Sequence, residues 1–207
     1  MADEARMSGE RREIPLFPLG TVLFPGGLLP LRIFEQRYME MTKRCLRDES
    51  PFGVCLIREG AEVGAPATPE AIGCLARIVH WDMQQLGLLQ VVARGVERFR
   101  VHETRIQADG LVLGGVEALP EAPDVPVPER FAFCRQLLER VAAEHGEDLF
   151  AKPYRFESST WVGARLAEVM PLPAASRQRL LEFDDPLMRL GVLQQLLSQS
   201  AGPAGSA

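Results

Sequence analysis

Lysine is the residue through which this chain could carry phosphoryl or peptidase chemistry, and only Lys43 and Lys152 occur. An ATP-binding P-loop ends in Gly-Lys-Ser/Thr, because its backbone amides and lysine neutralise the phosphates. Lys43 follows Thr42 and Lys152 follows Ala151, so neither ends a glycine loop. A Ser–Lys dyad needs a lysine held in a site that lowers its pKa. Lys43 falls on a predicted exposed helical face and Lys152 precedes a proline, so neither is predicted to be catalytic.

Other reactive residues are scattered rather than grouped. No G-x-S-x-G or H-E-x-x-H motif occurs, and the three histidines are remote in sequence. The cysteines show no C-x-x-C spacing and stand in apolar contexts, which indicates buried free thiols in a reducing cytosol. They are Cys45, Cys55, Cys74 and Cys134. We therefore expect no catalytic residue, no metal site and no cofactor.

Binding residues are easier to nominate than catalytic ones. Phe34, Arg37 and Tyr38 combine rings that bury large areas with a guanidinium that pairs with carbonyls or carboxylates, a combination suited to peptide recognition. The competing interpretation is that both rings close the fold and Arg37 pairs with Glu35 or Asp48.

Two further groups complete the candidates. Arg98 and Arg100 are predicted to face outward on a strand, either as a ligand surface or simply as a solvated face. Phe24 and Leu28 belong to an apolar loop that would be a partner site if exposed and a closure of the sheet if buried.

The stretch from Ile14 to Tyr38 must position these side chains. Prolines and glycines interrupt an apolar run, which predicts short strands at 13–17, 21–24 and 28–33. Pro25-Gly26-Gly27 predicts the turn between the last two strands. From Phe34 the apolar spacing changes to that of a helix, with Tyr38, Met41 and Cys45 on the same face as Phe34.

The remaining pattern predicts an α+β protein. Strands are expected at 52–58, 72–82, 88–93, 96–106 and 111–119, and helices at 131–146, 159–170, 174–182 and 186–198. The expected divisions are a disordered tail at 1–12, a β-rich part with one helix at 13–119, a proline-rich linker at 120–128, a helical part at 129–199 and a frayed tail at 200–207.

Composition narrows the class of protein. A hydrophobic content of 46% with 25% charged residues is typical of a soluble globular protein. The net charge of −5 argues against a general nucleic-acid binder. The charged amino terminus is unlike a signal peptide, and four prolines with Arg32 argue against a membrane helix at 14–34. We expect a cytoplasmic protein without a membrane partner.

The stretch PLFPLGTVLFPGGLLPLRIFEQRY resembles the opening of the LON substrate-binding domain, the amino-terminal domain of ATP-dependent Lon proteases. Later segments support the likeness across about residues 13 to 198. They are Phe52-Gly53-Val54, Ile72-Gly73-Cys74-Leu75-Ala76, Gly95 with Arg98-Phe99-Arg100-Val101, and Leu181-Glu182-Phe183-Asp184-Asp185-Pro186 with Arg189-Leu190. The resemblance implies a PUA-like β pseudo-barrel followed by a helical bundle.

The resemblance also implies a function. The leading hypothesis is a non-catalytic module that binds unfolded or partner polypeptides, without the ATPase and Ser–Lys peptidase of a full-length Lon protease. The alternatives are an RNA-binding PUA-like protein and a small-molecule enzyme that uses His80 or a cysteine between barrel and helices. The sequence leaves the oligomeric state open, a dimer included.

Overall fold

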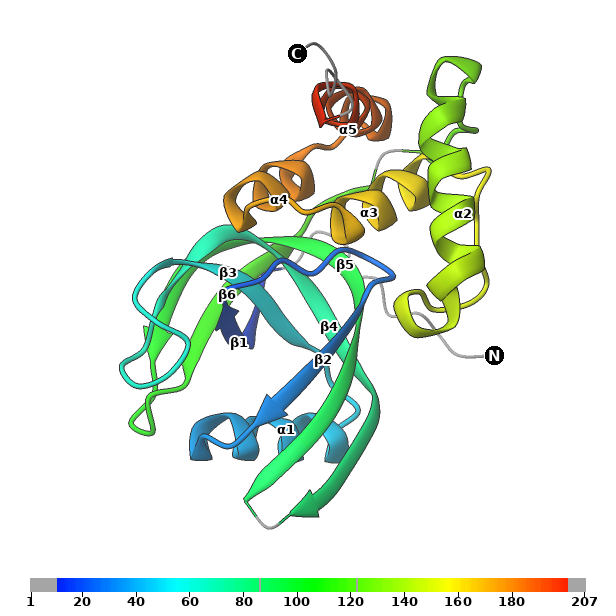
Figure 1. Cartoon of the computed structure of the whole chain (residues 1–207). Helices are drawn as coiled ribbons and strands as arrows, with labels where there is room; N and C mark the ends of the chain where they lie inside the picture. The colour runs from blue at the N-terminus through cyan, green and yellow to red at the C-terminus, as the bar shows by residue number, and fades with distance from the viewer. Residues whose placement is uncertain (1–10, 86, 122, 201–207) are drawn as a thin grey trace, which may run out of the picture. The chain divides into compact units, whose positions relative to one another are not determined.

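The computed structural model describes residues 11–85, 87–121 and 123–200, which form one six-stranded sheet and a set of helices (Figure 1). The strands are β1 (Arg12–Leu19), β2 (Leu28–Ile33), β3 (Phe52–Glu59), β4 (Thr68–Gln85), β5 (Leu88–Ile106) and β6 (Val112–Ala118). The helices are α1 (Gln36–Arg47), α2 (Ala132–Leu149), α3 (Ser159–Val169), α4 (Ala174–Glu182) and α5 (Pro186–Ser200), with a 3-10 turn η1 (Glu129–Phe131) before α2. The predicted combination of strands and helices is confirmed.

Three predictions within the strand-rich part were wrong. Residues 21–24 form no strand, because they lead directly into a turn and have no neighbouring strand to pair with. The helix begins at Gln36, so Phe34 lies outside it. The expected break at Arg94-Gly95 is absent, since β5 runs through it without interruption. Residues 1–10 and 201–207 of the predicted tails lie outside the described residues.

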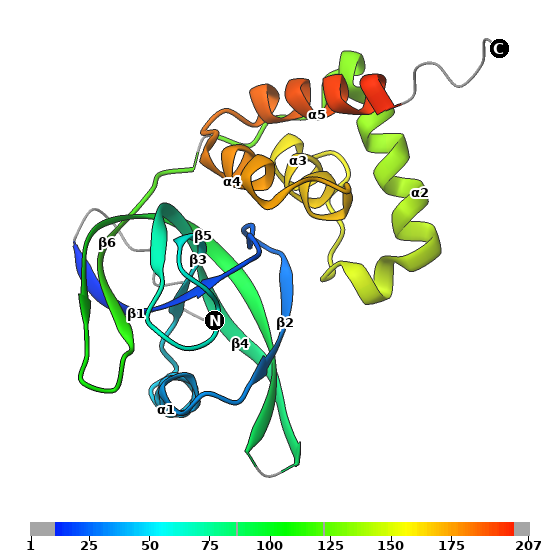
Figure 2. The same ribbon diagram turned by 60° about the vertical axis from the view of Figure 1, so that its left-hand side comes forward.

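Strand pairing in the first unit, which ends at Glu121, forms a closed circuit. β1 pairs in parallel with β3 and antiparallel with β6, and β3–β4, β4–β5 and β5–β6 are antiparallel pairs that close the loop. β2 stands outside this circuit. It pairs only with β5, so one of its edges has no partner strand among the described residues (Figure 2).

Small residues let the circuit close around one aromatic ring. A Cβ atom added to Gly53 or Gly73 would lie 2.7 Å from the Phe99 ring, which therefore occupies the space that larger side chains would need. The apolar cluster around this ring consists of Ile14, Leu16, Cys55, Leu75, Phe99, Val112 and Val116.

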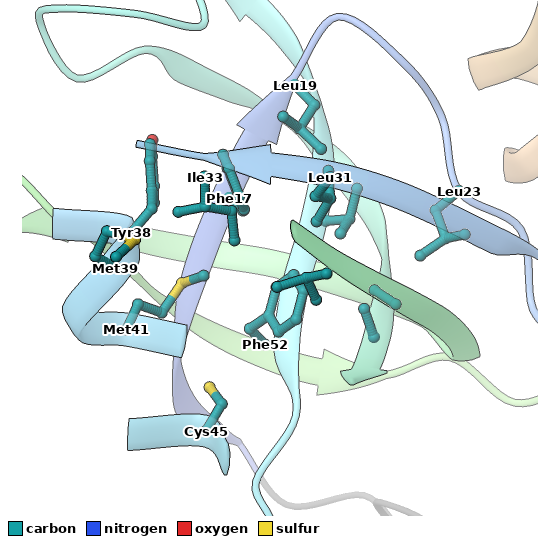
Figure 3. Packing of buried hydrophobic residues seen from close by; sticks show 14 of the residues in the cluster. Phe17, Leu19, Leu23, Leu31, Ile33, Tyr38, Met39, Met41, Cys45 and Phe52 are labelled. Atoms are coloured by element: carbon teal, nitrogen blue, oxygen red, sulfur yellow. The ribbon is translucent and has the colours of Figure 1, made fainter. Parts of the chain in front are cut away.

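A second apolar cluster lies between β1, β2, β3 and α1 (Figure 3). Tyr38, Met41 and Cys45 point from one face of α1 toward the strands, which confirms the predicted helical stripe apart from Phe34. β2 and α1 form the connection between the parallel strands β1 and β3 and cover this cluster.

The turn at Pro25 directs the chain into β2, which lies outside the closed circuit. Gly27 N–H donates to Phe24 O at 3.0 Å, and Gly26 has a φ of 77°, as the third residue of a type II turn requires. Gly26 N–H donates to Gly95 O, and Gly95 N–H donates to Gly27 O. Gly95 must be glycine, since an added Cβ would lie 2.1 Å from Phe24 O.

Residues 125–127 of the predicted linker are hydrogen-bonded to the segment that leads into α3. Val127 N–H donates to Glu157 O at 2.9 Å, and Ser159 N–H donates to Val125 O at 3.0 Å. These bonds tie the segment to the start of α3, where the Ser158 hydroxyl accepts from Trp161 N–H as a helix cap. Residues 125–127 thus hydrogen-bond with the helical unit.

Within the helical unit, α3 contacts α2, α4 and α5. The corner between α4 and α5 is closed by Arg189, which is buried and donates to Leu180 O at 2.8 Å and Phe183 O at 2.7 Å. These carbonyls end α4 and have no helical N–H to accept, so the guanidinium satisfies them. No helix within the described residues is long and apolar enough to cross a bilayer.

We expect Gly95→Ala to lower the free energy of unfolding by about 1–3 kcal/mol, because its Cβ would collide with rigid backbone at Phe24. The control is Gly115→Ala, whose Cβ would meet only the exposed side chain of Glu103, at 3.0 Å. Urea denaturation followed by circular dichroism measures both variants. Equal stability of the two would contradict the close-approach argument.

The four cysteines are free and buried, and burial raises the pKa of the Cys45 and Cys55 thiols and that of Cys134 to about 11. We expect a thiol reagent at pH 8 to label the unfolded chain fully and the native chain hardly at all, since only the thiolate reacts. The unfolded thiols ionise near pH 8.5, below the raised pKa values of Cys45, Cys55 and Cys134 in the fold, so stability should fall as pH rises above about 9. Fast labelling of the native chain would refute this.

Candidate functional site

An open groove of about 410 Å³ runs between the end of β1, the strand β2 and the loop between β3 and β4. Its lining is mainly apolar and comes from four separate parts of the first unit. The lining residues are Phe17, Leu19, Thr21, Leu29, Pro30, Leu31, Arg32, Ile33, Phe34, Glu35, Tyr38, Glu62 and Val63. Figure 3 shows Phe17, Ile33 and Tyr38 gathered where β1, β2 and α1 meet.

An aromatic stack forms the floor of the groove. The rings of Phe17 and Tyr38 lie 3.9 Å apart between centroids at an interplanar angle of 18°, and both residues are buried. Burial raises the pKa of the Tyr38 hydroxyl above its ordinary value. The guanidinium carbon of Arg37 lies 4.7 Å from the centre of the Tyr38 ring, within the range of a cation–π contact.

Arg37 fastens this floor to neighbouring segments. It is only 6% exposed, donates to Glu35 Oε2 at 2.9 Å and donates to Gly110 O at 3.2 Å. Arg37 does not reach solvent, because it donates to the carbonyl of Gly110 before β6 and to the Glu35 carboxylate, which hold it inward. The alternative interpretation, an ion pair with Glu35, is confirmed.

Two apolar side chains form the exposed rim. Phe34 and Val63 are each 57% exposed on the groove's borders. Phe34 lies before α1 and not on the helical face that packs against the strands. Its ring therefore reaches solvent, whereas Tyr38 lies on that face and is buried. Glu62 accepts a hydrogen bond from Gly20 N–H, which joins the β3–β4 loop to the end of β1.

The other predicted binding residues lie outside the groove lining. Phe24 is fully buried and Leu28 half-buried, so the apolar loop closes the fold instead of forming an exposed patch. Arg98 was predicted to face outward but is only 3% exposed, and it lies directly opposite the fully buried Cys74 of β4, so it shares the face that Cys74 turns toward the core. Arg100 is exposed as predicted, and its strand position faces Ile72 and Glu117.

Glu62 and Val63 were missed by sequence reasoning. They belong to a loop that reads only as a Gly/Ala/Pro-rich connection, and no local pattern ties it to residues 17–38. The groove depends on this long-range contact, which one sequence does not reveal.

The described lining of the groove holds two carboxylates, a tyrosine and a guanidinium but no histidine or cysteine. His80 is exposed near the end of β4, and His102 Nε2 lies 2.8 Å from Glu117 Oε2 on the paired strands β5 and β6. Across the described residues, no three His, Cys, Asp or Glu residues are arranged to hold a metal ion. The groove is chemically suited to apolar contact.

Similarity to known proteins indicates the family to which this chain belongs. Residues 13–199 match the sequence model of the ATP-dependent protease La (LON) substrate-binding domain. Lon protease of Anaeromyxobacter dehalogenans is 28% identical over 195 residues, which cover 90% of this chain and 23% of that protein. Protein cereblon of Danio rerio is 30% identical over 114 residues, or 53% of this chain and 26% of the relative. The match thus spans about a quarter of each of these relatives.

Solved structures give the same picture. The Lon N-terminal domain protein from Xanthomonas campestris is 37% identical with a TM-score of 0.74, and the match covers 90% of this chain and 98% of that one. The N-terminal domain of a Mycobacterium avium complex Lon protease, 17% identical, shares the fold with a TM-score of 0.65 and the same coverage. The predicted resemblance is confirmed, and the chain belongs to the family of the ATP-dependent protease La (LON) substrate-binding domain.

Proposed function

We propose that this chain is a polypeptide-recognition module that binds exposed apolar segments of unfolded or partner proteins in the groove beside β2. The observation that carries the proposal is an open apolar groove of about 410 Å³ whose rim leaves Phe34 57% exposed. Contact between a large apolar ring and water is unfavourable, and a partner that covers the ring removes this contact. Membership of a substrate-binding family supports the same function.

The groove is suited to a chain without a unique sequence. Its floor is rigid, because the Phe17–Tyr38 stack is buried and Arg37 is held at 2.9 and 3.2 Å by two partners. Apolar contact on such a floor depends on shape and area more than on directed hydrogen bonds. Aromatic anchors of this kind dominate the binding energy of many interfaces.

The finer architecture is part of the proposal. We infer that the closed strand circuit is a PUA-like pseudo-barrel and that α2 to α5 form a helical bundle behind a proline-rich linker at 120–128. In this arrangement the barrel side, at 13–119, carries the recognition groove. Residues 129–199 would hold the domain in whatever assembly it joins, in the cytoplasm.

The proposal includes the absence of catalysis by this chain. Neither Lys43 nor Lys152 stands in a phosphate-binding or dyad context, as argued above. Peptide hydrolysis by a related full-length protease would then require parts that these residues do not supply.

Replacing Phe34 with serine should weaken binding of a reduced, carboxymethylated unfolded protein by about tenfold or more, since it removes the exposed aromatic anchor. The matched control is Phe133→Ser, because Phe133 is similarly exposed, at 49%, but lies in α2. Fluorescence anisotropy at physiological salt measures both. If the two variants bind alike, or if the wild type binds no unfolded protein while folded, the groove is not the recognition site.

The purified chain, supplied with ATP and Mg²⁺, should release no fragments from casein during an incubation of several hours. The reason is that neither of its lysines stands in a P-loop or in a Ser–Lys dyad. Gel electrophoresis of the casein measures the result, with a non-specific protease as the positive control. A casein-cleaving activity that copurifies with the chain would disprove the non-catalytic assignment.

A further inference from the structure

The free edge of β2 borders the groove and points backbone groups toward it. Gly95 N–H donates to Gly27 O at 2.9 Å, and the register continues as Leu28↔Arg94 through Ile33↔Leu89. In an antiparallel pair the hydrogen-bonding residues alternate, so residues 29, 31 and 33 face β5. The backbone groups of Leu28, Pro30 and Arg32 therefore face away from β5, where the described residues provide no partner strand.

Pro30 fits this assignment. A proline inside a sheet is tolerated where its missing N–H would face outward from an edge strand. The open edge consequently offers the N–H groups of Leu28 and Arg32 and the carbonyls of all three outward residues. These groups can hydrogen-bond an added extended chain, as in peptide recognition by strand addition.

The outer face beside this edge is rich in arginine. Leu31 and Ile33 are buried toward the core, so Arg32 projects on the opposite face, where it is exposed. In the adjoining strands Arg94 and Arg77 lie directly opposite each other and are also exposed. Like charges in that position repel.

These arginines have little internal compensation. Within the described ranges Arg77 donates to the Glu49 carbonyl at 2.9 Å, while Arg32 and Arg94 have no carboxylate partner. Exposed His80 lies opposite Val92, and half-buried Asp82, opposite Gln90, is the acidic group on these three strands nearest Arg32. On this face of the three strands Arg32, Arg77 and Arg94 thus outnumber Asp82, although Arg32 also lines the groove together with Glu35, which pairs with Arg37, and Glu62.

We infer that the chain captures its polypeptide as an added strand on the free edge of β2, with a preference for segments in which acidic and apolar residues alternate. Successive side chains of a strand point to opposite faces, so one set would enter the apolar groove and the other would lie beside Arg32. This inference rests on the proposed function and specifies how that same groove recognises its ligand.

A second copy of this chain fits the edge less well. A two-fold pairing of β2 with itself centred on Pro30 would place proline opposite proline and lose both hydrogen bonds of that pair. Proline and a charged residue on an edge strand are devices that discourage association of like edges. An acidic strand from another protein meets neither obstacle.

The test uses synthetic peptides somewhat longer than β2 in which valine alternates with glutamate, lysine or serine, titrated into the full chain by fluorescence anisotropy. We expect the glutamate peptide to bind about fivefold or more tighter than the lysine peptide, and Arg32→Glu to abolish or reverse that preference. The charge control is Arg44→Glu, an exposed arginine of α1 that does not line the groove.

Backbone pairing is tested separately with N-methylated versions of the glutamate peptide. Methyl groups on every second amide should abolish binding in one phase of the alternation and spare it in the other, because only one set of amides faces β2. Circular dichroism of each variant verifies folding.

The results distinguish failure of strand addition from failure of the proposed polypeptide recognition. Equal binding of the three peptides, or indifference to methylation in both phases, overturns strand addition but leaves an apolar groove if unfolded proteins still bind and Phe34→Ser weakens them. Failure of every peptide and every unfolded protein overturns the proposed function as well. Tight, salt-sensitive binding of a single-stranded oligonucleotide that depends on Arg32 would assign the arginine face to nucleic acid instead.

Discussion

The contact between the Pro25 turn and Gly95 is the constraint on which the rest of the first unit depends. Two backbone hydrogen bonds, of 2.8 and 2.9 Å, join Gly26 and Gly27 to Gly95, and Phe24 O occupies the place of a side chain at residue 95. This close approach turns the chain from β1 onto β5 without a strand at 21–24. It places β2 outside the closed circuit and leaves one edge of β2 open.

The groove follows from that placement. β1 pairs with β6 only as far as Leu16, so Phe17 and Leu19 continue past the last β6 partner and face β2 across the cluster covered by α1. Tyr38 fills part of this space by stacking on Phe17, and Arg37 locks the entry to α1 against Glu35 and Gly110. Rigidity at the floor and exposure at Phe34 thus arise from adjacent residues of one short segment.

Sequence reasoning succeeded where proline and glycine mark boundaries. β2 at Leu28–Ile33 and α4 at Ala174–Glu182 were predicted with the observed limits, because Pro25-Gly26-Gly27 and Pro171-Leu172-Pro173 determine where they begin. It failed where the outcome depends on distant neighbours. Predicting the burial of Arg98 requires its partner across the sheet, the fully buried Cys74 of β4, and the approach of Glu62 to Gly20 joins residues that are 42 positions apart.

Pro30 affects both how strongly and how selectively the edge of β2 can pair with another strand. A fully competent edge strand would pair with any exposed strand, including another copy of itself, and would promote aggregation. Removing one N–H from the centre of the edge and placing Arg32 next to it weakens such indiscriminate pairing, yet leaves donors at Leu28 and Arg32 and a groove for alternate side chains. Selectivity would then come from what the partner adds, namely apolar residues for the Phe17–Tyr38 floor and acidic residues for the arginine face. An edge strand with one N–H fewer and a charged side chain beside the gap pairs less strongly with any added strand than an uninterrupted edge would.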